Sequence, residues 1–87
     1  MYLHIGGDRL VSLRSIVAIL DARLLTSSEA LRQMAGSLRA IDQWEDISEG
    51  EGKSLVLTDS GMIVSVISPL TLYRRAYRRN AFVEAER

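Results

Sequence analysis

The sequence predicts a small α/β (α+β) fold in which a short antiparallel sheet packs against two helices. Three observations support this prediction. Apolar residues alternate with polar ones, or follow one another, in short N-terminal segments typical of strands. Two later segments show helical spacing, and serine precedes each of them. Between these two segments lies a second pair of strands, joined by a turn that contains glycine. At 87 residues, the chain is expected to form a single domain over 1–87.

The first twenty residues predict three short strands. Apolar and polar residues alternate over 1–5, the pattern of a half-buried strand. Gly6-Gly7 then supplies the positive φ angles that a tight reversal needs. The second strand follows at 11–13, and the nearly continuous apolar segment 15–20 suits an interior strand. Arg14 lies between these two apolar segments, so an isolated cation is expected at a strand entrance.

A helix is expected over about residues 28–42. Ser28 offers an N-cap hydroxyl, and Glu29 lies in the first turn, where its charge favours the positive end of the helix dipole. A short strand at 43–47 and a flexible loop at 48–52 are expected next. The apolar residues of this helix recur at helical spacing and are expected to cover one face of the sheet: Leu31, Met34, Ala35, Leu38 and Ile41.

A β-hairpin is the clearest prediction in the second half of the chain. Its strands cover 54–58 and 62–67, and a three-residue connection, Asp59-Ser60-Gly61, joins them. Strict alternation places two apolar sets on opposite faces: Leu55, Leu57, Ile63 and Ile67 on one, and Val56, Met62, Val64 and Val66 on the other. One helix covers only one face. The other is left for the C-terminal helix or for another subunit, and the shortness of the chain favours the subunit.

The last predicted element is a helix from Pro69 to about Ala81. Ser68 suits its N-cap, and proline at the first helical position loses no hydrogen bond. At about 100° per residue, one apolar stripe forms along it: Leu70, Tyr73, Tyr77 and Ala81. Four arginines lie on the flank beside this stripe: Arg74, Arg75, Arg78 and Arg79.

Charge is balanced over the whole chain but unevenly distributed. The 11 basic and 11 acidic residues cancel, so the chain has no bulk attraction for nucleic acid or anionic lipid. Residues 1–41 carry a net charge of +2, residues 42–68 carry −5, and residues 69–87 carry +3. A basic C-terminal segment therefore follows an acidic middle segment.

Composition argues against several classes of protein. The absence of cysteine excludes disulfide and thiolate sites and is compatible with a reducing cytoplasm. No apolar run approaches the roughly 20 residues that span a bilayer, and the N-terminus has no signal-type pattern. We expect a cytoplasmic protein without a membrane partner. His4 is the only histidine, so no catalytic or metal-binding set is evident, and neither an enzyme nor a cofactor is expected.

The segment Gly50-Glu51-Gly52-Lys53-Ser54 superficially matches the end of a phosphate-binding loop. That motif also requires a glycine at the position of Ile47, and a helix after the lysine whose N–H groups meet the phosphates. A strand is predicted there instead. No nucleotide is therefore expected as a partner.

The arginine cluster at 74–79 is interleaved with tyrosines and has two interpretations of similar weight. Arginines neutralise phosphates and tyrosines stack on bases, which favours a nucleic-acid contact. Alternatively, the cluster is a solvated helix flank that pairs with the acidic residues 42–51, including those of another subunit.

The opening Met1-Tyr2-Leu3-His4-Ile5-Gly6, followed by Val11-Ser12, Arg14 and Ile16-Val17, resembles the bacterial extracellular-matrix (biofilm) regulators of the Rem type. The start of the last helix, Ser68-Pro69-Leu70-Thr71-Leu72, is similar to that of the B branch of this family. The resemblance implies a fold like the DNA-binding modules of response regulators, assembled as a homo-oligomeric ring. It also implies a role in gene regulation. Arg14 matches an arginine that is associated with DNA contact in the family.

The chain departs from the family's A branch at one loop. A run of arginines stands there in the A branch, whereas this chain has Glu49-Gly50-Glu51-Gly52 followed by Lys53. Acidic groups repel phosphates, so this loop does not transfer DNA binding as a whole. We expect a homo-oligomeric regulator of transcription that contacts DNA phosphates through six residues: Arg14, Lys53, Arg74, Arg75, Arg78 and Arg79. The alternative is an oligomeric protein-interaction or scaffold module, without DNA binding, whose arginines form salt bridges between subunits.

Overall fold

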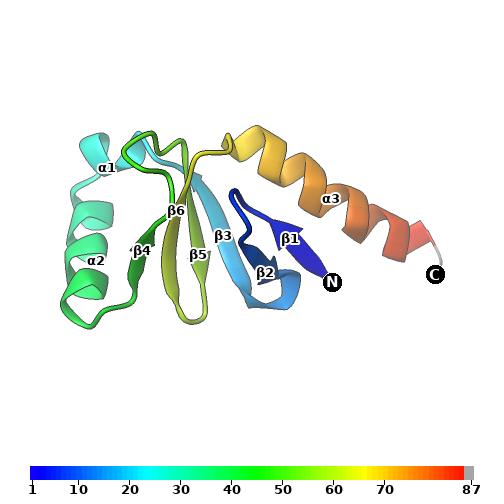
Figure 1. Cartoon of the computed structure of the whole chain (residues 1–87), viewed down its shortest axis with the longest axis horizontal. Coiled ribbons are helices and arrows are strands. Elements are labelled where there is room, and N and C mark those ends of the chain that lie inside the picture. The colour runs from blue at the N-terminus through cyan, green and yellow to red at the C-terminus, as the bar shows by residue number, and fades with distance from the viewer. Residues whose placement is uncertain (86–87) are drawn as a thin grey trace.

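The computed structural model describes the backbone of residues 1–85 and the side chains of residues 1–77. Its elements are, in chain order, β1 (Tyr2–His4), β2 (Leu10–Ser12), the 3-10 helix η1 (Leu13–Ser15), β3 (Ile16–Asp21), α1 (Leu24–Ser27), α2 (Glu29–Ala40), β4 (Trp44–Asp46), β5 (Ser54–Thr58), β6 (Gly61–Ser65) and α3 (Pro69–Ala85) (Figure 1). The mixed α/β class is confirmed, with one short helix, α1, beyond the two predicted.

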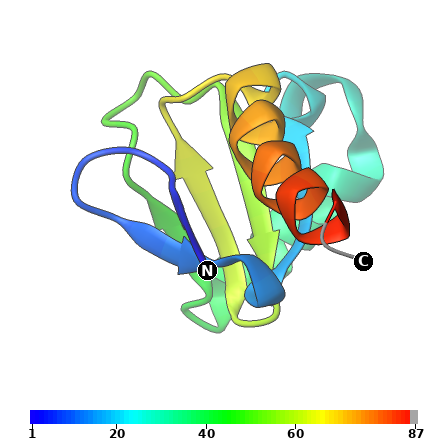
Figure 2. The same ribbon diagram turned by 90° about the vertical axis from the view of Figure 1, so that its right-hand side faces the viewer.

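Three layers make up the molecule, with a four-stranded sheet of order β3-β5-β6-β4 in the middle. Helix α2 covers one face of this sheet (Figure 1). The hairpin β1–β2, which is a separate two-stranded sheet, and α3 cover the other face (Figure 2). The chain therefore buries both apolar faces of the sheet by itself. Of the two expected coverings of the second face, the C-terminal helix is therefore the one observed, and the favoured alternative of a neighbouring subunit was wrong.

The central sheet is mixed, whereas a purely antiparallel sheet was expected. Strand β4 runs parallel to β6, while the pairs β3–β5 and β5–β6 are antiparallel. Strands β3 and β4 consequently point in the same direction, and α2 connects them as a crossover helix. The hairpin β5–β6 fills the two positions between them.

The register of the β5–β6 hairpin differs from the prediction by one residue. Gly61 is already paired with Thr58, so the turn contains two residues instead of three. Val56 therefore lies opposite Ile63, and the two share one face. Because side chains alternate along a strand, a shift of one residue moves a whole strand's apolar set to the other face. The predicted alternation within each strand was right, but the assignment of the two strands to common faces was wrong.

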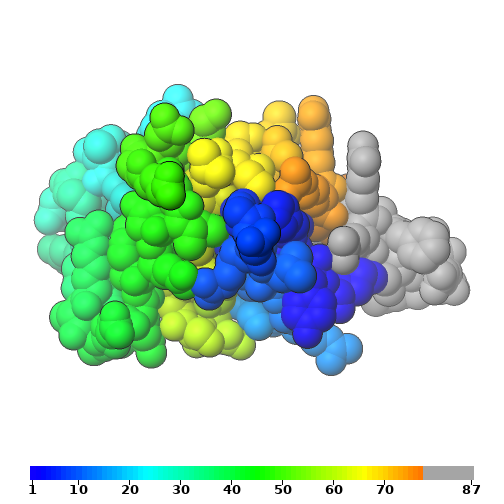
Figure 3. Space-filling model, viewed as in Figure 1, coloured from blue at the N-terminus to red at the C-terminus, as the bar shows by residue number. Residues whose placement is uncertain are grey.

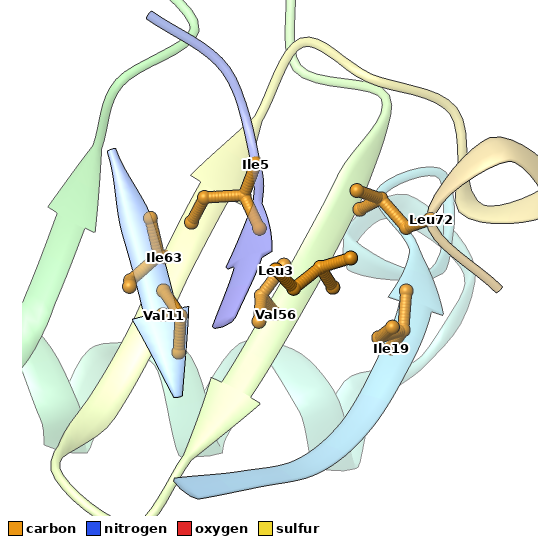
Figure 4. Close-up of a cluster of buried hydrophobic side chains, with 7 residues drawn as sticks. All are labelled: Leu3, Ile5, Val11, Ile19, Val56, Ile63 and Leu72. Atoms are coloured by element: carbon orange, nitrogen blue, oxygen red, sulfur yellow. The ribbon is translucent and has the colours of Figure 1, made fainter. Parts of the chain in front are cut away.

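Two hydrophobic cores follow from this register. The first lies beneath the N-terminal hairpin and α3 and contains Leu3, Ile5, Val11, Ile19, Val56, Ile63 and Leu72 (Figure 4). The second lies beneath α2 and contains Leu31, Leu55, Met62 and Val64. Ser65 Oγ donates to the Ile5 carbonyl at 2.6 Å and thereby fixes the N-terminal hairpin on the sheet.

Helix α2 begins as predicted and ends two residues early. Ser28 Oγ accepts a hydrogen bond from the Leu31 N–H at 3.2 Å, the expected N-cap. At the other end, Asp42 adopts a positive φ of 59°, which terminates the helix. Met34 and Ile41 were expected on the buried face, but both are exposed.

Helix α3 begins at the predicted Ser68-Pro69 start, where Ser68 Oγ accepts from the Thr71 N–H, and continues to Ala85. Its packed side differs from the predicted stripe. Leu72 is fully buried and Ala76 packs against the same core. The stripe residues Leu70, Tyr73 and Tyr77 are exposed, and the side chain of Ala81 lies outside the described residues.

Candidate nucleic-acid interface

Arg14 lies on a well-anchored turn between two strands. It is the middle residue of η1, and its N–H donates to Ser12 Oγ at 3.3 Å. The Leu13 N–H donates to the Met1 carbonyl, and the Ser15 carbonyl accepts from the Asp59 N–H, both at 3.0 Å. The Arg14 side chain is exposed and forms no ion pair with the described residues. The turn therefore fixes the backbone that carries this solvated guanidinium.

Lys53 lies at the entrance of β5. Its N–H donates to the Ser65 carbonyl at 2.8 Å, and its carbonyl accepts from the Ala22 N–H at 3.0 Å. The backbone is thus fixed, while the side chain is exposed. Lys53 and Gly52 line a shallow pocket of about 360 Å³ together with Asp21, Arg23, Ser68 and Pro69.

Arg23 is a second basic residue of this pocket, and sequence analysis did not identify it. Its Nη2 lies 2.7 Å from Asp21 Oδ2. Hydrogen bonds from the Arg23 side chain and N–H lower the pKa of the Asp21 carboxyl to about 2. Asp21 therefore compensates the charge of Arg23. Only the Asp21-x-Arg23 spacing hints at this pair, and its position near Lys53 depends on the β3–β5 register.

The structure does not bring Arg14 and Lys53 together in one subunit. Ile16, two residues after Arg14, pairs with Thr58, whereas Asp21 pairs with Ser54, next to Lys53. The two cations are therefore at opposite ends of the β3–β5 pair. A strand of this length separates them by roughly 20 Å at about 3.3 Å per residue.

The arginines of α3 divide into three groups. Arg75 Nη1 donates to the His4 carbonyl at 3.0 Å and links α3 to β1. Arg74 is exposed and lines a shallow depression of about 400 Å³ with Tyr73, Ala76 and Tyr77. Arg78 and Arg79 belong to the α3 backbone, but their side chains lie outside the described residues.

The acidic segment lies on the face of the molecule that carries the N-terminal hairpin (Figure 3). Arg9 of the hairpin pairs with Glu45 of β4 at 2.6 Å. At the end of β4, Asp46 Oδ1 accepts from the Ser48 N–H of the following loop at 2.8 Å. Glu49 and Glu51 are exposed within two to four residues of Lys53. Their charges weaken any attraction of phosphate to this lysine.

Metal-binding clusters and membrane-spanning helices are both absent from the described residues. In that part of the chain, no three His, Cys, Asp or Glu side chains are placed to hold a metal ion. None of the helices described combines the length and apolar character that crossing a bilayer requires.

Comparison with known proteins assigns the chain to a family. No curated protein is significantly similar to it. The model of one protein family, however, matches residues 2–76. This range includes η1, the entrance of β5 and the first half of α3, which carry Arg14, Lys53, Arg74 and Arg75. A match over most of the chain shows that it belongs to the RemA-like family, the extracellular matrix regulatory protein A-like proteins.

Proposed function

We propose that this chain is a non-enzymatic regulator of transcription that binds DNA as a homo-oligomer in the cytoplasm. Membership of a family of matrix regulatory proteins supports the regulatory part of the proposal. The observation that carries the DNA part is the exposed Arg14 guanidinium on a turn whose backbone is held by Met1, Ser12 and Asp59. A solvated cation on a fixed backbone suits contact with a phosphate group. Assignment to the B branch stays a prediction from the residues quoted above.

Several subunits are required because each one offers few cations at separate places. Arg14 and Lys53 are at opposite ends of the β3–β5 pair, and Arg74 lies on α3. Glu49 and Glu51 reduce the positive potential near Lys53. Repetition of Arg14 around an assembly makes later phosphate contacts intramolecular, which raises the affinity without new kinds of contact.

The arginines of α3 are secondary candidates. Arg74 is exposed. Arg75 uses one nitrogen for the His4 carbonyl and retains further N–H groups for a phosphate. We therefore keep all six predicted basic residues as candidates and place Arg14 first.

Mobility shifts with the Arg14→Ala variant test this proposal. Because the residue repeats in every subunit, we expect a loss of affinity of more than tenfold, with unchanged oligomer size by sedimentation. Arg39→Ala is the matched control, since Arg39 lies on α2, stacked over Trp44 on the opposite face of the sheet. An Arg14→Ala variant that binds as well as Arg39→Ala would contradict the role of Arg14.

A further inference from the structure

The outer side of α3 forms an apolar surface with one cation. Leu70, Tyr73 and Tyr77 are exposed, with Tyr77 at 70%. The Tyr73 hydroxyl donates to the Ile19 carbonyl, so one wall of the depression beside Arg74 is fixed. On the buried side of the helix, Leu72 and Ala76 pack against the first hydrophobic core, and the exposed residues lie away from it. In the described part of the chain, the apolar stripe of α3 therefore lacks a covering partner.

The C-terminal end of α2 carries a feature that is complementary to this surface of α3. Ile41 is 61% exposed and is followed by Asp42. The Leu38 carbonyl accepts from the N–H groups of Ile41 at 3.3 Å and Gln43 at 2.8 Å, which holds this end rigid. Of the large apolar residues exposed in residues 1–77, only Ile41 has an acidic neighbour in sequence. The end of α2 thus presents an apolar side chain beside a carboxylate.

We propose that the Tyr73–Tyr77 depression of one copy receives Ile41 of a second copy, with Asp42 against Arg74. The two surfaces are complementary, since an apolar side chain meets an apolar depression and a carboxylate meets a guanidinium. The acidic middle segment and the basic C-terminal segment have the same complementarity on a larger scale. This inference rests on the self-assembly in the proposed function and names the surfaces that form it.

The contact joins unlike surfaces of the two copies. Helices α2 and α3 are at opposite ends of the longest axis of the molecule (Figure 1), so they do not meet within one chain. Each copy consequently uses one surface toward each neighbour. Such head-to-tail contacts produce a closed ring when the rotation between copies closes, and an open filament when it does not.

Two blocking variants test the contact by sedimentation velocity. Ile41→Asp blocks the α2 side and Tyr77→Asp blocks the α3 side, and both side chains are exposed, so circular dichroism should show an intact fold. Each variant alone is expected to sediment as a monomer. Their equimolar mixture is expected to sediment as a dimer, because one intact pair of surfaces remains. Leu10→Asp, an exposed apolar position on β2, is the control and should keep the wild-type size.

The outcomes separate this inference from the proposed function. Wild-type assembly by either blocking variant, or a monomeric mixture, would overturn the named contact and leave self-assembly intact. A monomeric wild type would overturn both. The charge pair has its own test: Arg74→Glu and Asp42→Arg should each weaken assembly, and the chain with both changes should recover it. Failure to recover would contradict the Asp42–Arg74 pairing.

Discussion

At the scale of residues, Gly61 shows how one missing side chain allows two segments to meet. It begins β6 with a φ of +135°, and an added Cβ would lie 2.1 Å from the Gln43 carbonyl oxygen. The same carbonyl accepts from the Met62 N–H at 2.9 Å, at the start of the β4–β6 pairing. A side chain at position 61 would therefore separate β4 from β6.

We predict that Gly61→Ala destabilises the protein by roughly 3 kcal/mol or more, since backbone strain and overpacking each cost about 1–3 kcal/mol. Gly36→Ala is the matched control. Nothing lies within 4 Å of a Cβ there, and alanine favours the α2 helix by about 1 kcal/mol. Urea denaturation measures both changes. Equal effects of the two substitutions would contradict the close approach at Gly61.

The Asp21–Arg23 pair predicts a defined pH dependence. The folded-state pKa of Asp21 is about 2, below its ordinary value of 3.8, because Arg23 binds the charged carboxylate. The contribution of the Asp21–Arg23 pair to the free energy of unfolding is therefore present above pH 4 and is lost as the pH falls from about 4 to 2. Wild type should be more stable than Asp21→Asn at pH 6, and this difference should vanish near pH 2. A difference that persists at pH 2 would show that the carboxylate is not responsible.

At the scale of elements, sequence patterns located nearly every helix and strand but did not specify how they face one another. The strands, the Ser28 cap and the Ser68-Pro69 start were all correctly predicted. The β5–β6 faces were not, because a turn of two or three residues satisfies the same Asp59-Ser60-Gly61 pattern. The turn chosen depends on where β4 and Gln43 pass, which is a tertiary effect.

Tertiary contacts also explain why only part of the candidate site could be predicted from the sequence. Arg14 at a strand entrance was predictable, because a charge interrupts an apolar run. The link from Arg75 to the His4 carbonyl was not, since it joins residues 71 positions apart. The packed side of α3 was also wrongly predicted. Leu72 and Ala76 face the core, whereas Leu70, Tyr73 and Tyr77 do not, because the loop after β6 sets the rotation of the helix.

Docking of α3 provides a test at this scale. The Tyr73 hydroxyl donates to the Ile19 carbonyl of the edge strand β3, while Tyr77 is exposed and reaches no such partner among the described residues. We predict that Tyr73→Phe lowers the free energy of unfolding by about 1 kcal/mol, the usual contribution of one hydrogen bond. Tyr77→Phe should leave it unchanged within about 0.5 kcal/mol. Thermal or urea unfolding compares the two, and equal stabilities would argue against the contact with β3.

At the scale of the whole molecule, the neutral net charge conceals a separation of charge that is compatible with the proposed assembly and the proposed DNA binding. Acidic residues gather in the middle segment and basic residues in the C-terminal segment. Since Arg14, Lys53 and Arg74 of one copy lie apart, we expect strong phosphate binding only from an assembly that repeats them. Sequence preference should then be moderate and arise from DNA that bends easily, because phosphate contacts carry no base information. Competition between flexible and stiff duplexes of equal length would measure this preference for easily bent DNA. Equal affinities for the two duplexes would contradict this origin of the preference.

The proposed role of repeated Arg14 residues is tested by the salt dependence of DNA binding by wild type and Arg14→Ala. Each phosphate contact contributes about −0.9 to the slope of log affinity against log salt concentration for duplex DNA. If several subunits each place Arg14 on a phosphate, the substitution should make the slope shallower by clearly more than one contact's worth. Identical slopes for the two proteins would contradict the claim that repeated Arg14 residues hold the DNA.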